Sequence, residues 1–275
     1  MSAGASGSDP AELLELATRL ARESGQLLVE ASRHRLDRLA LVDTARRKSS
    51  TTDLATEADR ASEQHIVGGI KRARPADGLL GEEGSEHEGT SGLTWIIDPI
   101  DGTTNFVYGF GTWAVSIGVA DGAGALAGAV YDPLRDEMFT AVRGAGSFLD
   151  GRRLGPVDAV ALDESLIGTG FSYAAVNRRN QARLLPVVLP RVRDIRRAGA
   201  ASLDLCYVGA GRLNGYYESG LHPWDRAAGL LVATEAGAGF RDVEGLDPRR
   251  STLVVAPPGL LEELLALLVE AAARR

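Results

Sequence analysis

Cysteine is rare and the histidines are not clustered in this sequence of 275 residues. Cys206 is the only cysteine, and the four histidines are scattered without the HExxH spacing of zinc hydrolases. These absences exclude an internal disulfide and a cysteine-rich metal site, and they argue against a zinc centre. Because Cys206 lies in the apolar stretch 203–208, we predict that it is a small buried hydrophobic residue.

The chain also lacks the motifs of three large enzyme classes. It has no GxxxxGK[ST], which excludes a P-loop NTPase, and no GxSxG, which argues against a serine hydrolase. It has no GxGxxG after a strand, so a dinucleotide-binding enzyme is not indicated. No uninterrupted apolar run approaches the length of a membrane span.

Net positive charge is missing as well. The 30 basic and 37 acidic residues give a formal charge of −7, which argues against nonspecific binding to nucleic acid or to a membrane. A phosphorylated ligand would therefore need metal ions or backbone amides to supply a local positive field. Residues 1–8 are small and polar without the features of a signal peptide, so we expect a flexible tail and a cytoplasmic protein.

Helical spacing dominates the beginning of the chain. A long amphipathic helix is expected to begin at Pro10, and a capping box at 56–59 predicts a second helix that ends before Pro75. The polar segment between them is not assigned to either helix. Short apolar or alternating runs then predict strands at 79–81 and 93–97 and an antiparallel meander at 112–143.

After residue 150 the pattern changes to alternating strands and helices. Strands are predicted at 166–170, 193–196, 214–217 and 252–256, and helices at 200–211, 224–236 and after residue 258. Residues 178–191 are expected to form a helix or a helical turn. This change predicts two halves, an α+β half at 9–150 and an α/β half at 151–275.

The most informative segment is WIIDPIDGTTNF at 95–106. An apolar strand delivers Asp98 and Asp101 at its carboxyl end, and the small residues of Gly102-Thr103-Thr104 can turn backbone amides toward an anion. Carboxylates and phosphate oxygens are the ligands that Mg²⁺ prefers. Taken alone, a D-P-x-D segment favours a strand followed by a solvated turn over a metal site.

Acidic residues of the same kind recur along the chain. They are Asp53 and Asp59 around the second helix start, Glu82 after a short apolar strand, and Asp225 in the segment WDRAAGLLVATEAGA. An ordinary helix-capping role competes with a ligand role for Asp225, because the helix dipole favours a carboxylate there. Each of these sites on its own favours a structural role, but together and in this order they form a pattern.

That pattern resembles the inositol monophosphatase family of Mg²⁺-dependent, lithium-sensitive phosphomonoesterases. The two long segments at 95–106 and 224–238 resemble its signatures, and shorter matches occur at 48–50, 53–59 and 216–218. The resemblance extends over roughly residues 10–270. It implies a layered αβαβα sandwich of the sugar-phosphatase type, a homodimer, and a metal-activated water that attacks phosphorus without a covalent phosphoenzyme.

The resemblance also assigns roles to individual residues. The expected ligands of about two to three Mg²⁺ ions are Glu82, Asp98, Asp101, Asp225, the carbonyl of Ile100 and, at a weaker site, Asp59. Glu82, Thr103 and Asp59 form the expected catalytic set. Substrate contacts are expected from Gly102, Thr103, Gly199, Ala200, Ala201, Glu218, Asp225 and Lys48.

Two departures and several alternatives bear on the substrate. The two departures from the family are Ala200, where many members carry Ser or Thr, and Pro223, which precedes Trp224. Lys48 is equally compatible with a role near the active site and with an ordinary surface position. The substrate is expected to be inositol 1-phosphate or a related small polyol phosphate. Histidinol phosphate and fructose 1,6-bisphosphate remain alternatives, and a sulfated nucleotide is disfavoured. A binding module for the transcription machinery is the non-enzymatic alternative.

Overall fold

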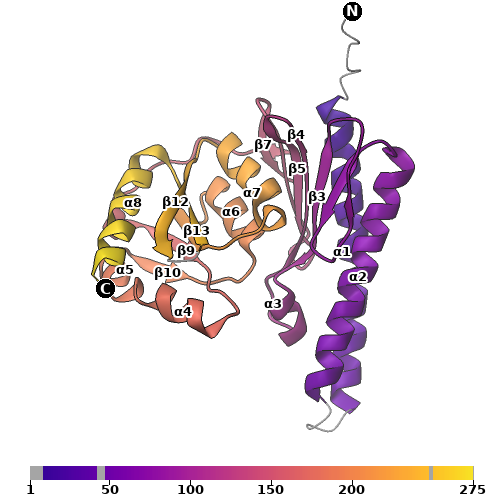
Figure 1. Cartoon of the computed structure of the whole chain (residues 1–275), viewed down its shortest axis with the longest axis horizontal. Helices are drawn as coiled ribbons and strands as arrows, with labels where there is room; N and C mark the ends of the chain where they lie inside the picture. Colours follow the sequence, from indigo (N-terminus) through magenta and orange to yellow (C-terminus); the bar gives the residue numbers. More distant parts are fainter. Residues whose placement is uncertain (1–8, 42–46, 248–249, 275) are drawn as a thin grey trace, which may run out of the picture.

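Two β-sheets and three groups of helices stack as five layers (Figure 1). The computed structural model describes residues 9–41, 47–247 and 250–274, and within the first two helices it describes side chains at 10–33 and 57–73. The order of layers is helix, sheet, helix, sheet, helix. The predicted αβαβα sandwich is therefore confirmed.

The larger sheet contains eight strands in the order β2-β1-β3-β4-β5-β6-β7-β8. Only β1 and β3 pair in parallel, and every other described neighbour pair in this sheet is antiparallel. The strands are β1 (Gly78–Gly81), β2 (Glu86–His87), β3 (Thr94–Asp101), β4 (Ala114–Asp121), β5 (Gly124–Asp132), β6 (Glu137–Val142), β7 (Gly146–Leu149) and β8 (Arg152–Arg153).

The smaller sheet has the order β10-β9-β11-β13-β12. Strand β9 is parallel to both β10 and β11, whereas β13 is antiparallel to β11 and to β12. The strands are β9 (Leu166–Thr169), β10 (Asp194–Arg196), β11 (Gly215–Ser219), β12 (Gly239–Asp247) and β13 (Arg250–Ala256).

Helices cover both outer faces and fill the space between the sheets. Two long helices, α1 (Pro10–Leu41) and α2 (Arg47–Ala73), cover the outer face of the larger sheet. The middle layer consists of α6 (Ala201–Gly209) and α7 (Pro223–Glu235). The other helices are α3 (Thr103–Tyr108), α4 (Ala175–Ala182), α5 (Leu185–Val188), α8 (Pro258–Ala273) and the 3₁₀ turns η1 (Leu162–Glu164) and η2 (Leu189–Arg191).

Several predicted boundaries are wrong. Helix α2 begins at Arg47 rather than in the capping box at 56–59. The segment 178–191, expected as a helix or a helical turn, is divided into α4, α5 and η2, where Pro186 and Pro190 lack the amide that a continuous helix needs. Strand β12 was not predicted, because its mostly exposed residues at 239–247 lack a clear apolar alternation.

The two sheets are formed by successive parts of the chain. The last strand of the larger sheet ends at Arg153, and the smaller sheet begins at Leu166. The middle helices contact both sheets, so the two halves share the layer between them. The boundary near residue 150 remains a prediction.

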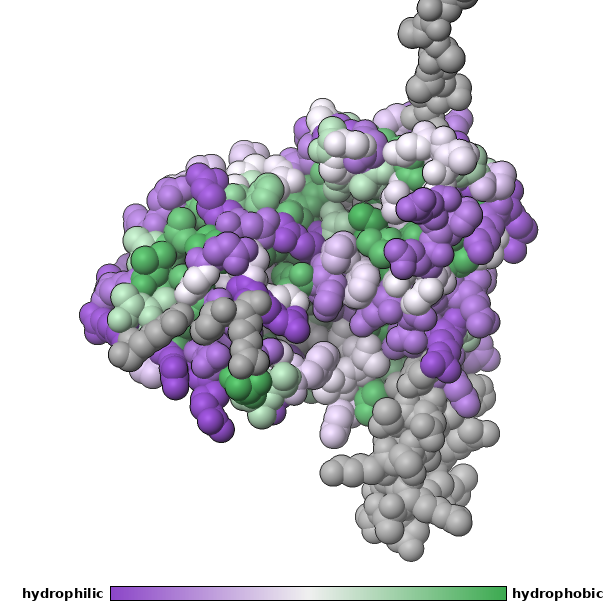
Figure 2. Space-filling model, viewed as in Figure 1, coloured by the Kyte–Doolittle hydropathy of each residue, from purple (hydrophilic) through white to green (hydrophobic). Residues whose placement is uncertain are grey.

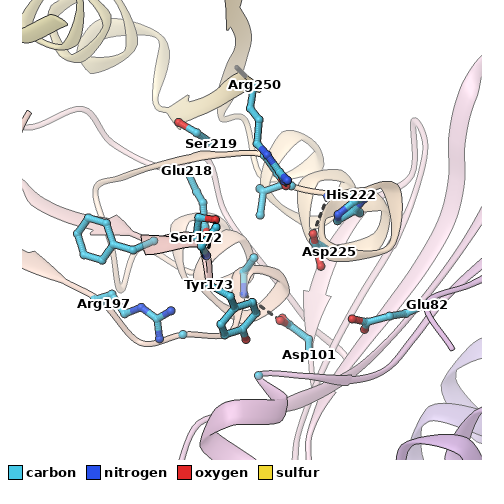
Figure 3. Close-up of a pocket in the computed structure, with 17 residues that line it drawn as sticks. Glu82, Asp101, Ser172, Tyr173, Arg197, Glu218, Ser219, His222, Asp225 and Arg250 are labelled. Carbon is cyan, nitrogen blue, oxygen red and sulfur yellow. Dashed lines mark hydrogen bonds between the residues drawn. The ribbon is translucent and has the colours of Figure 1, made fainter. Parts of the chain in front are cut away.

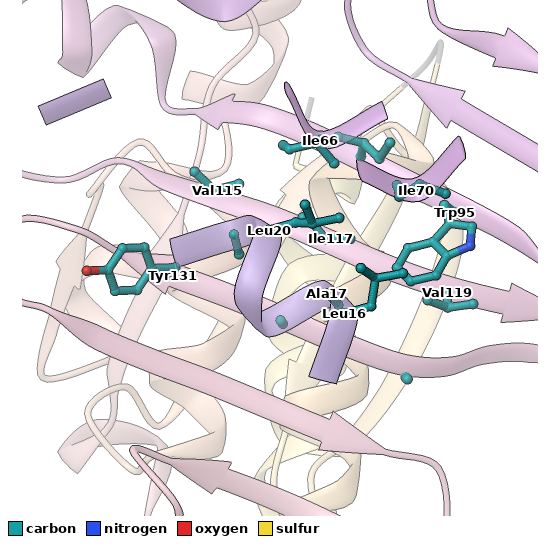
Figure 4. Packing of buried hydrophobic residues seen from close by; sticks show 14 of the residues in the cluster. Leu16, Ala17, Leu20, Ile66, Ile70, Trp95, Val115, Ile117, Val119 and Tyr131 are labelled. Carbon is teal, nitrogen blue, oxygen red and sulfur yellow. The ribbon is translucent and has the colours of Figure 1, made fainter. Parts of the chain in front are cut away.

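Four clusters of buried apolar side chains hold the five layers together. The cluster under α1 and α2 includes Leu20, Ile66, Ile70, Trp95 and Ile117 (Figure 4). Trp95 is fully buried, and its indole Nε1 donates a hydrogen bond of 2.9 Å to Asp77. The other three clusters lie between successive layers. Cys206 is buried in one of them, as predicted.

The described surface is more polar than these clusters. On the face shown in Figure 2, hydrophobic residues form small patches among hydrophilic ones. In the part of the chain that the structure describes, no helix has the length and apolar character needed to cross a membrane.

The middle helices approach their neighbours closely through small residues. A Cβ on Gly229 of α7 would lie 2.6 Å from the carbonyl oxygen of Ser202 in α6, and a Cβ on Gly128 of β5 would lie 2.9 Å from Cα of Ala228. These distances are shorter than van der Waals contact. The glycines therefore set how closely α7 packs against α6 and the larger sheet.

We predict that Gly229→Ala destabilises the protein by about 1–2 kcal/mol. Overpacking against a fixed backbone costs about 1–3 kcal/mol, which outweighs the gain of up to about 1 kcal/mol for replacing Gly in a helix. Urea unfolding measures the change. Gly122→Ala is the matched control, since a Cβ on Gly122 would contact nothing within 4 Å. Equal midpoints for the two variants would contradict the prediction.

Candidate active site

Elements from both halves of the chain meet at one cavity of about 370 Å³ (Figure 3). The end of β1 contributes Glu82, the end of β3 contributes Asp101, and the end of β11 contributes Glu218. The first residues of α6 and α7 contribute Ala201 and Asp225. The volume lies in the range of small-molecule binding sites.

Most of the residues predicted for the site gather here, in two groups. The cavity is lined by Glu82, Asp101, Gly102, Gly199, Ala201, Glu218 and Asp225. A second group lies in the wall next to these residues and comprises Asp59, Asp98, Ile100, Thr103 and Ala200. The side chain of Lys48 lies outside the described residues, as does that of Asp53.

Parallel pairing of β1 and β3 places Glu82 beside Asp98. Gly81 is the register partner of Ile97, and the Glu82 amide donates to the Ile97 carbonyl at 3.1 Å. The carboxyl groups of Glu82 and Asp98 then share a hydrogen bond. Removal from water and the surrounding carboxylates raise the pKa of Glu82 to about 7 and hold that of buried Asp98 well above its usual value.

Asp101 caps the first turn of α6. Its carboxylate accepts hydrogen bonds from the Ala201 amide at 3.2 Å, the Ser202 amide at 2.7 Å and the Ser202 hydroxyl at 2.5 Å. Burial raises the pKa of Asp101 to about 6, with a further contribution from Asp225, although the three donors act in the opposite direction. Asp101 thus ties the end of β3 to the middle layer.

Asp59 and Thr103, two members of the expected catalytic set, are neighbours. Asp59, on α2, is only 3% exposed. The Thr103 hydroxyl lies 2.9 Å from the Ile100 carbonyl and 3.4 Å from Asp59 Oδ2, so its one proton can be donated to either oxygen. Burial and the nearby charges of Glu83 and Glu82 raise the pKa of Asp59 to about 8.

Asp225 begins α7 and takes part in its cap. The His222 amide donates to Asp225 Oδ2 at 2.6 Å, and the two residues form a capping box. Burial raises the pKa of Asp225 to about 6, and the charge of Glu218 also raises it. The His222 ring stacks on Trp224 with centroids 4.9 Å apart. The capping role considered for Asp225 is therefore present in the structure.

Gly102 forms the turn between β3 and α3. Its φ of 93° lies in the left-handed region, and a Cβ there would be only 3.0 Å from the Thr112 carbonyl oxygen and 3.1 Å from that of Gly199. Both observations require glycine. The amides of a first helical turn have no partners within the helix, so the turn can present donors to an anion in the cavity.

Glu218 occupies the wall of the cavity formed by the smaller sheet. It accepts a hydrogen bond from the Tyr216 hydroxyl, and a Cβ on Gly170 would overlap its carboxylate at 1.8 Å. Gly170 therefore leaves the room that the carboxylate occupies. Burial raises the pKa of Glu218, whereas the hydrogen bond from Tyr216 lowers it.

The sequence did not indicate Glu63, which supports the turn that carries Glu82. Glu63 on α2 is 3% exposed, and its carboxylate accepts the amides of Glu83 at 2.9 Å and Ser85 at 3.0 Å. Its spacing of four residues from Asp59 places both on one helical face and is the only available signal. Glu63 positions the turn through the backbone.

Three further cavity residues were also missed. Ser172 and Tyr173 come from the loop between β9 and α4, and Arg197 comes from the segment between β10 and α6. None belongs to a motif that the sequence singled out. They reach the cavity only because the smaller sheet places both loops on the same side of Glu218 (Figure 3).

The carboxylates offer oxygen ligands but no preformed cage. Among the described residues, no three His, Cys, Asp or Glu side chains are close enough to hold a metal ion by themselves. Within the described part of the chain, Oδ1 of Asp59 and Oδ1 of Asp98 are buried without hydrogen-bond partners. The donor chemistry fits a hard divalent cation, since Mg²⁺ is usually held by one or two carboxylates together with water and phosphate oxygens.

Comparisons with known proteins agree with this arrangement. The model of the inositol monophosphatase family matches residues 9–274. The chain belongs to this family. The inositol-1-monophosphatase SuhB of Mycobacterium tuberculosis is 42% identical over 276 residues, which cover 94% of each chain. The Nus factor SuhB of Pseudomonas aeruginosa is 41% identical over 239 residues, or 85% of this chain and 86% of the relative.

A solved structure also matches over nearly the full length. Mycobacterium tuberculosis SuhB has a TM-score of 0.79 and 40% sequence identity, with 96% of this chain and 98% of that chain covered. The family membership predicted from the two signatures is thus confirmed. Family and relatives together support a phosphatase.

We predict that the metal-free protein becomes less stable as pH rises from about 4 to 8. The raised pKa values of about 6 for Asp101 and Asp225, and about 8 for Asp59, mean that the folded protein binds more protons than the unfolded chain in this range. The melting temperature in excess chelator measures the effect. Asp98→Asn should flatten the slope, because one of the mutually repelling carboxylates is gone. An unchanged slope in that variant would contradict the prediction.

Proposed function

We propose that the chain is a Mg²⁺-dependent phosphomonoesterase that hydrolyses inositol 1-phosphate or a related small polyol phosphate. The observation that carries this proposal is the convergence of Glu82, Asp98, Asp101 and Asp225 beside the glycine turn at Gly102. Four carboxylates would repel a phosphate unless divalent cations lay between them. Membership in a family that is generally metal-dependent supports the same reading.

Mg²⁺ would be held by Glu82, Asp98, Asp101, Asp225 and the Ile100 carbonyl, with Asp59 at a weaker site, about two to three ions in all. Bound there, it would lower the pKa of a water molecule and neutralise the charge on the leaving alkoxide. No covalent intermediate with the protein is required.

The residues of the chain then have separate tasks. Glu82 and Thr103 orient the attacking water. Asp59 holds the Thr103 hydroxyl. The amides of Gly102 and Thr103 bind the phosphate.

Recognition of the alcohol falls to the other wall. Glu218 accepts hydrogen bonds from substrate hydroxyl groups, and the backbone at 199–201 lies on the same side of the cavity. Ala200 is buried and offers no hydroxyl to the substrate. Histidinol phosphate and fructose 1,6-bisphosphate remain alternative substrates, because their hydrolysis uses the same carboxylates.

A second candidate function comes from the relatives. The Pseudomonas aeruginosa relative is named a Nus factor, which supports contact of this chain with the transcription machinery as an alternative or additional activity. The acidic net charge of −7 favours a protein partner over direct binding to RNA. Retention of RNA polymerase on the immobilised chain tests this candidate. From the family resemblance we also expect a homodimer and inhibition by lithium.

Chelation should abolish phosphatase activity, and added Mg²⁺ should restore it. Asp98→Asn keeps the side-chain shape but removes a charge from the centre of the carboxylate cluster, so activity should fall by several orders of magnitude. Hydrolysis of inositol 1-phosphate with fixed Mg²⁺ measures both effects. Arg241→Gln, on the exposed surface in an ion pair with Glu262, is the control and should keep full activity. Full turnover in excess chelator would sink the metal-dependent mechanism.

Glu218→Ala should impair polyol substrates selectively. Loss of a charged acceptor for a hydroxyl costs about 1.5–3 kcal/mol, or about one to two decades in kcat/KM for inositol 1-phosphate. An aryl phosphate without hydroxyl groups should be affected little. Equal large losses on both substrates would place Glu218 in the metal or folding machinery, and no loss on either would make it a bystander.

A further inference from the structure

Arg197 is one of the side chains that line the cavity. Among the described residues it makes no hydrogen bond and no ion pair within 4.0 Å. Its neighbours in the fold differ. Arg196 pairs with Asp194 at 2.5 Å, and Arg250, the other arginine that lines the cavity, donates to the Gly220 carbonyl at 3.2 Å. Arg197 is therefore available to a ligand.

The guanidinium of Arg197 lies over Gly199. A Cβ on Gly199 would be 2.4 Å from an Nη atom of Arg197, and the φ of 88° at Gly199 keeps this position free of a side chain. The Gly199 carbonyl in turn lies against the turn at Gly102, 3.1 Å from the position of a Cβ there. A continuous backbone contact thus connects the proposed phosphate-binding turn to the arginine.

Arg197 lies on the side of the cavity opposite Glu82. Figure 3 shows Glu82 at one end of the cavity, Asp101 near its middle, and Arg197 beyond Tyr173 at the other end. If the phosphate to be cleaved lies next to the carboxylates and Gly102, the rest of the substrate extends toward Arg197. The guanidinium then faces the alcohol part of the ester.

Two acidic groups face Arg197, and neither neutralises it by contact. Glu218 from β11 and Asp204 from α6 both interact with its charge at longer range. Asp204 is buried, with 1% exposure, whereas Glu218 lines the cavity and accepts the Tyr216 hydroxyl. Glu218 thus offers an acceptor for hydroxyl groups, and Arg197 offers a cation separate from it.

We propose that Arg197 binds a second anionic group on the alcohol part of the substrate. The preferred substrates would be polyol phosphates that also carry a carboxylate or a second phosphate, with Glu218 binding hydroxyl groups and Arg197 the anion. This inference rests on the proposed phosphatase function. Guanidinium binds either anion through paired N–H groups, so both kinds of substrate share one chemistry.

Matched substrate pairs test the proposal. Fructose 1,6-bisphosphate is compared with fructose 1-phosphate, and 6-phosphogluconate with glucose 6-phosphate, at fixed Mg²⁺. The wild-type protein should favour the acidic member of at least one pair, and the pair that responds distinguishes a second phosphate from a carboxylate. Arg197→Gln should lower kcat/KM for that acidic ester about ten- to a hundredfold, with the neutral ester changed less than about threefold.

Two variants control for charge and folding. Arg196→Gln removes a neighbouring charge that does not line the cavity and should leave both substrates unaffected. Arg197→Lys should recover part of the preference, because it restores the charge but not the paired donors. Equal losses on acidic and neutral esters in Arg197→Gln would assign the arginine to the phosphate that is cleaved and overturn the proposal, as would no change on either.

Calorimetry separates this inference from the proposed phosphatase function. If the wild-type protein hydrolyses neither these esters nor inositol 1-phosphate, the phosphatase proposal fails, but titration with 6-phosphogluconate and fructose 1,6-bisphosphate still measures binding. We expect an acidic ester to bind wild type and Arg196→Gln with equal affinity and Arg197→Gln about tenfold or more weakly. Equal binding of an acidic ester by wild type and Arg197→Gln, or no binding by any of the three proteins, would overturn the role of Arg197.

Discussion

Repulsion among carboxylates that are held together out of water is the constraint on which the rest of the structure depends. Asp98 is 1% exposed and shares a hydrogen bond with Glu82, while Asp101 and Asp225 lie within electrostatic reach. Burial and like charge raise the pKa of each group, which means that ionising them without a counter-cation destabilises the folded state. The fold must therefore recover the cost elsewhere, and it does so through helix termini and close packing.

The middle layer supplies much of that compensation. Asp101 receives three hydrogen bonds at the start of α6, and Asp225 receives the His222 amide at the start of α7. Helix N-termini stabilise negative charge, so the same two helices that separate the sheets also tolerate the carboxylates. Gly128 and Gly229 allow these helices to approach their neighbours closely. The packing of the middle layer and the electrostatics of the cavity are therefore coupled, because any displacement of α7 would also displace Asp225.

Much of the acidic cluster could be predicted from sequence, but its supports could not. Asp98 and Asp101 follow an apolar strand within one short motif, and local sequence is sufficient to place both at its end. Glu63 and Arg197 do not belong to any such local motif. Glu63 binds backbone amides about 20 residues away in the chain, and Arg197 lines a cavity that forms only after folding. The same difference explains the missed strand β12, whose exposed residues join the sheet through backbone pairing to β13 rather than through an apolar pattern.

The amino-acid sequence by itself determined the family and the identity of the acidic side chains, because both depend on local motifs. The layered architecture followed from the resemblance to that family, since apolar periodicity alone indicated only two halves of different pattern. Only the tertiary structure decided which of these side chains line the cavity and which stand behind it. It also decided that Glu218 fits against Gly170 and that the Arg197 guanidinium has no hydrogen-bond or ion-pair partner among the described residues. The physical reason is that burial, pKa and hydrogen-bond saturation depend on distances between segments brought together from both halves of the chain, and no local pattern encodes those distances.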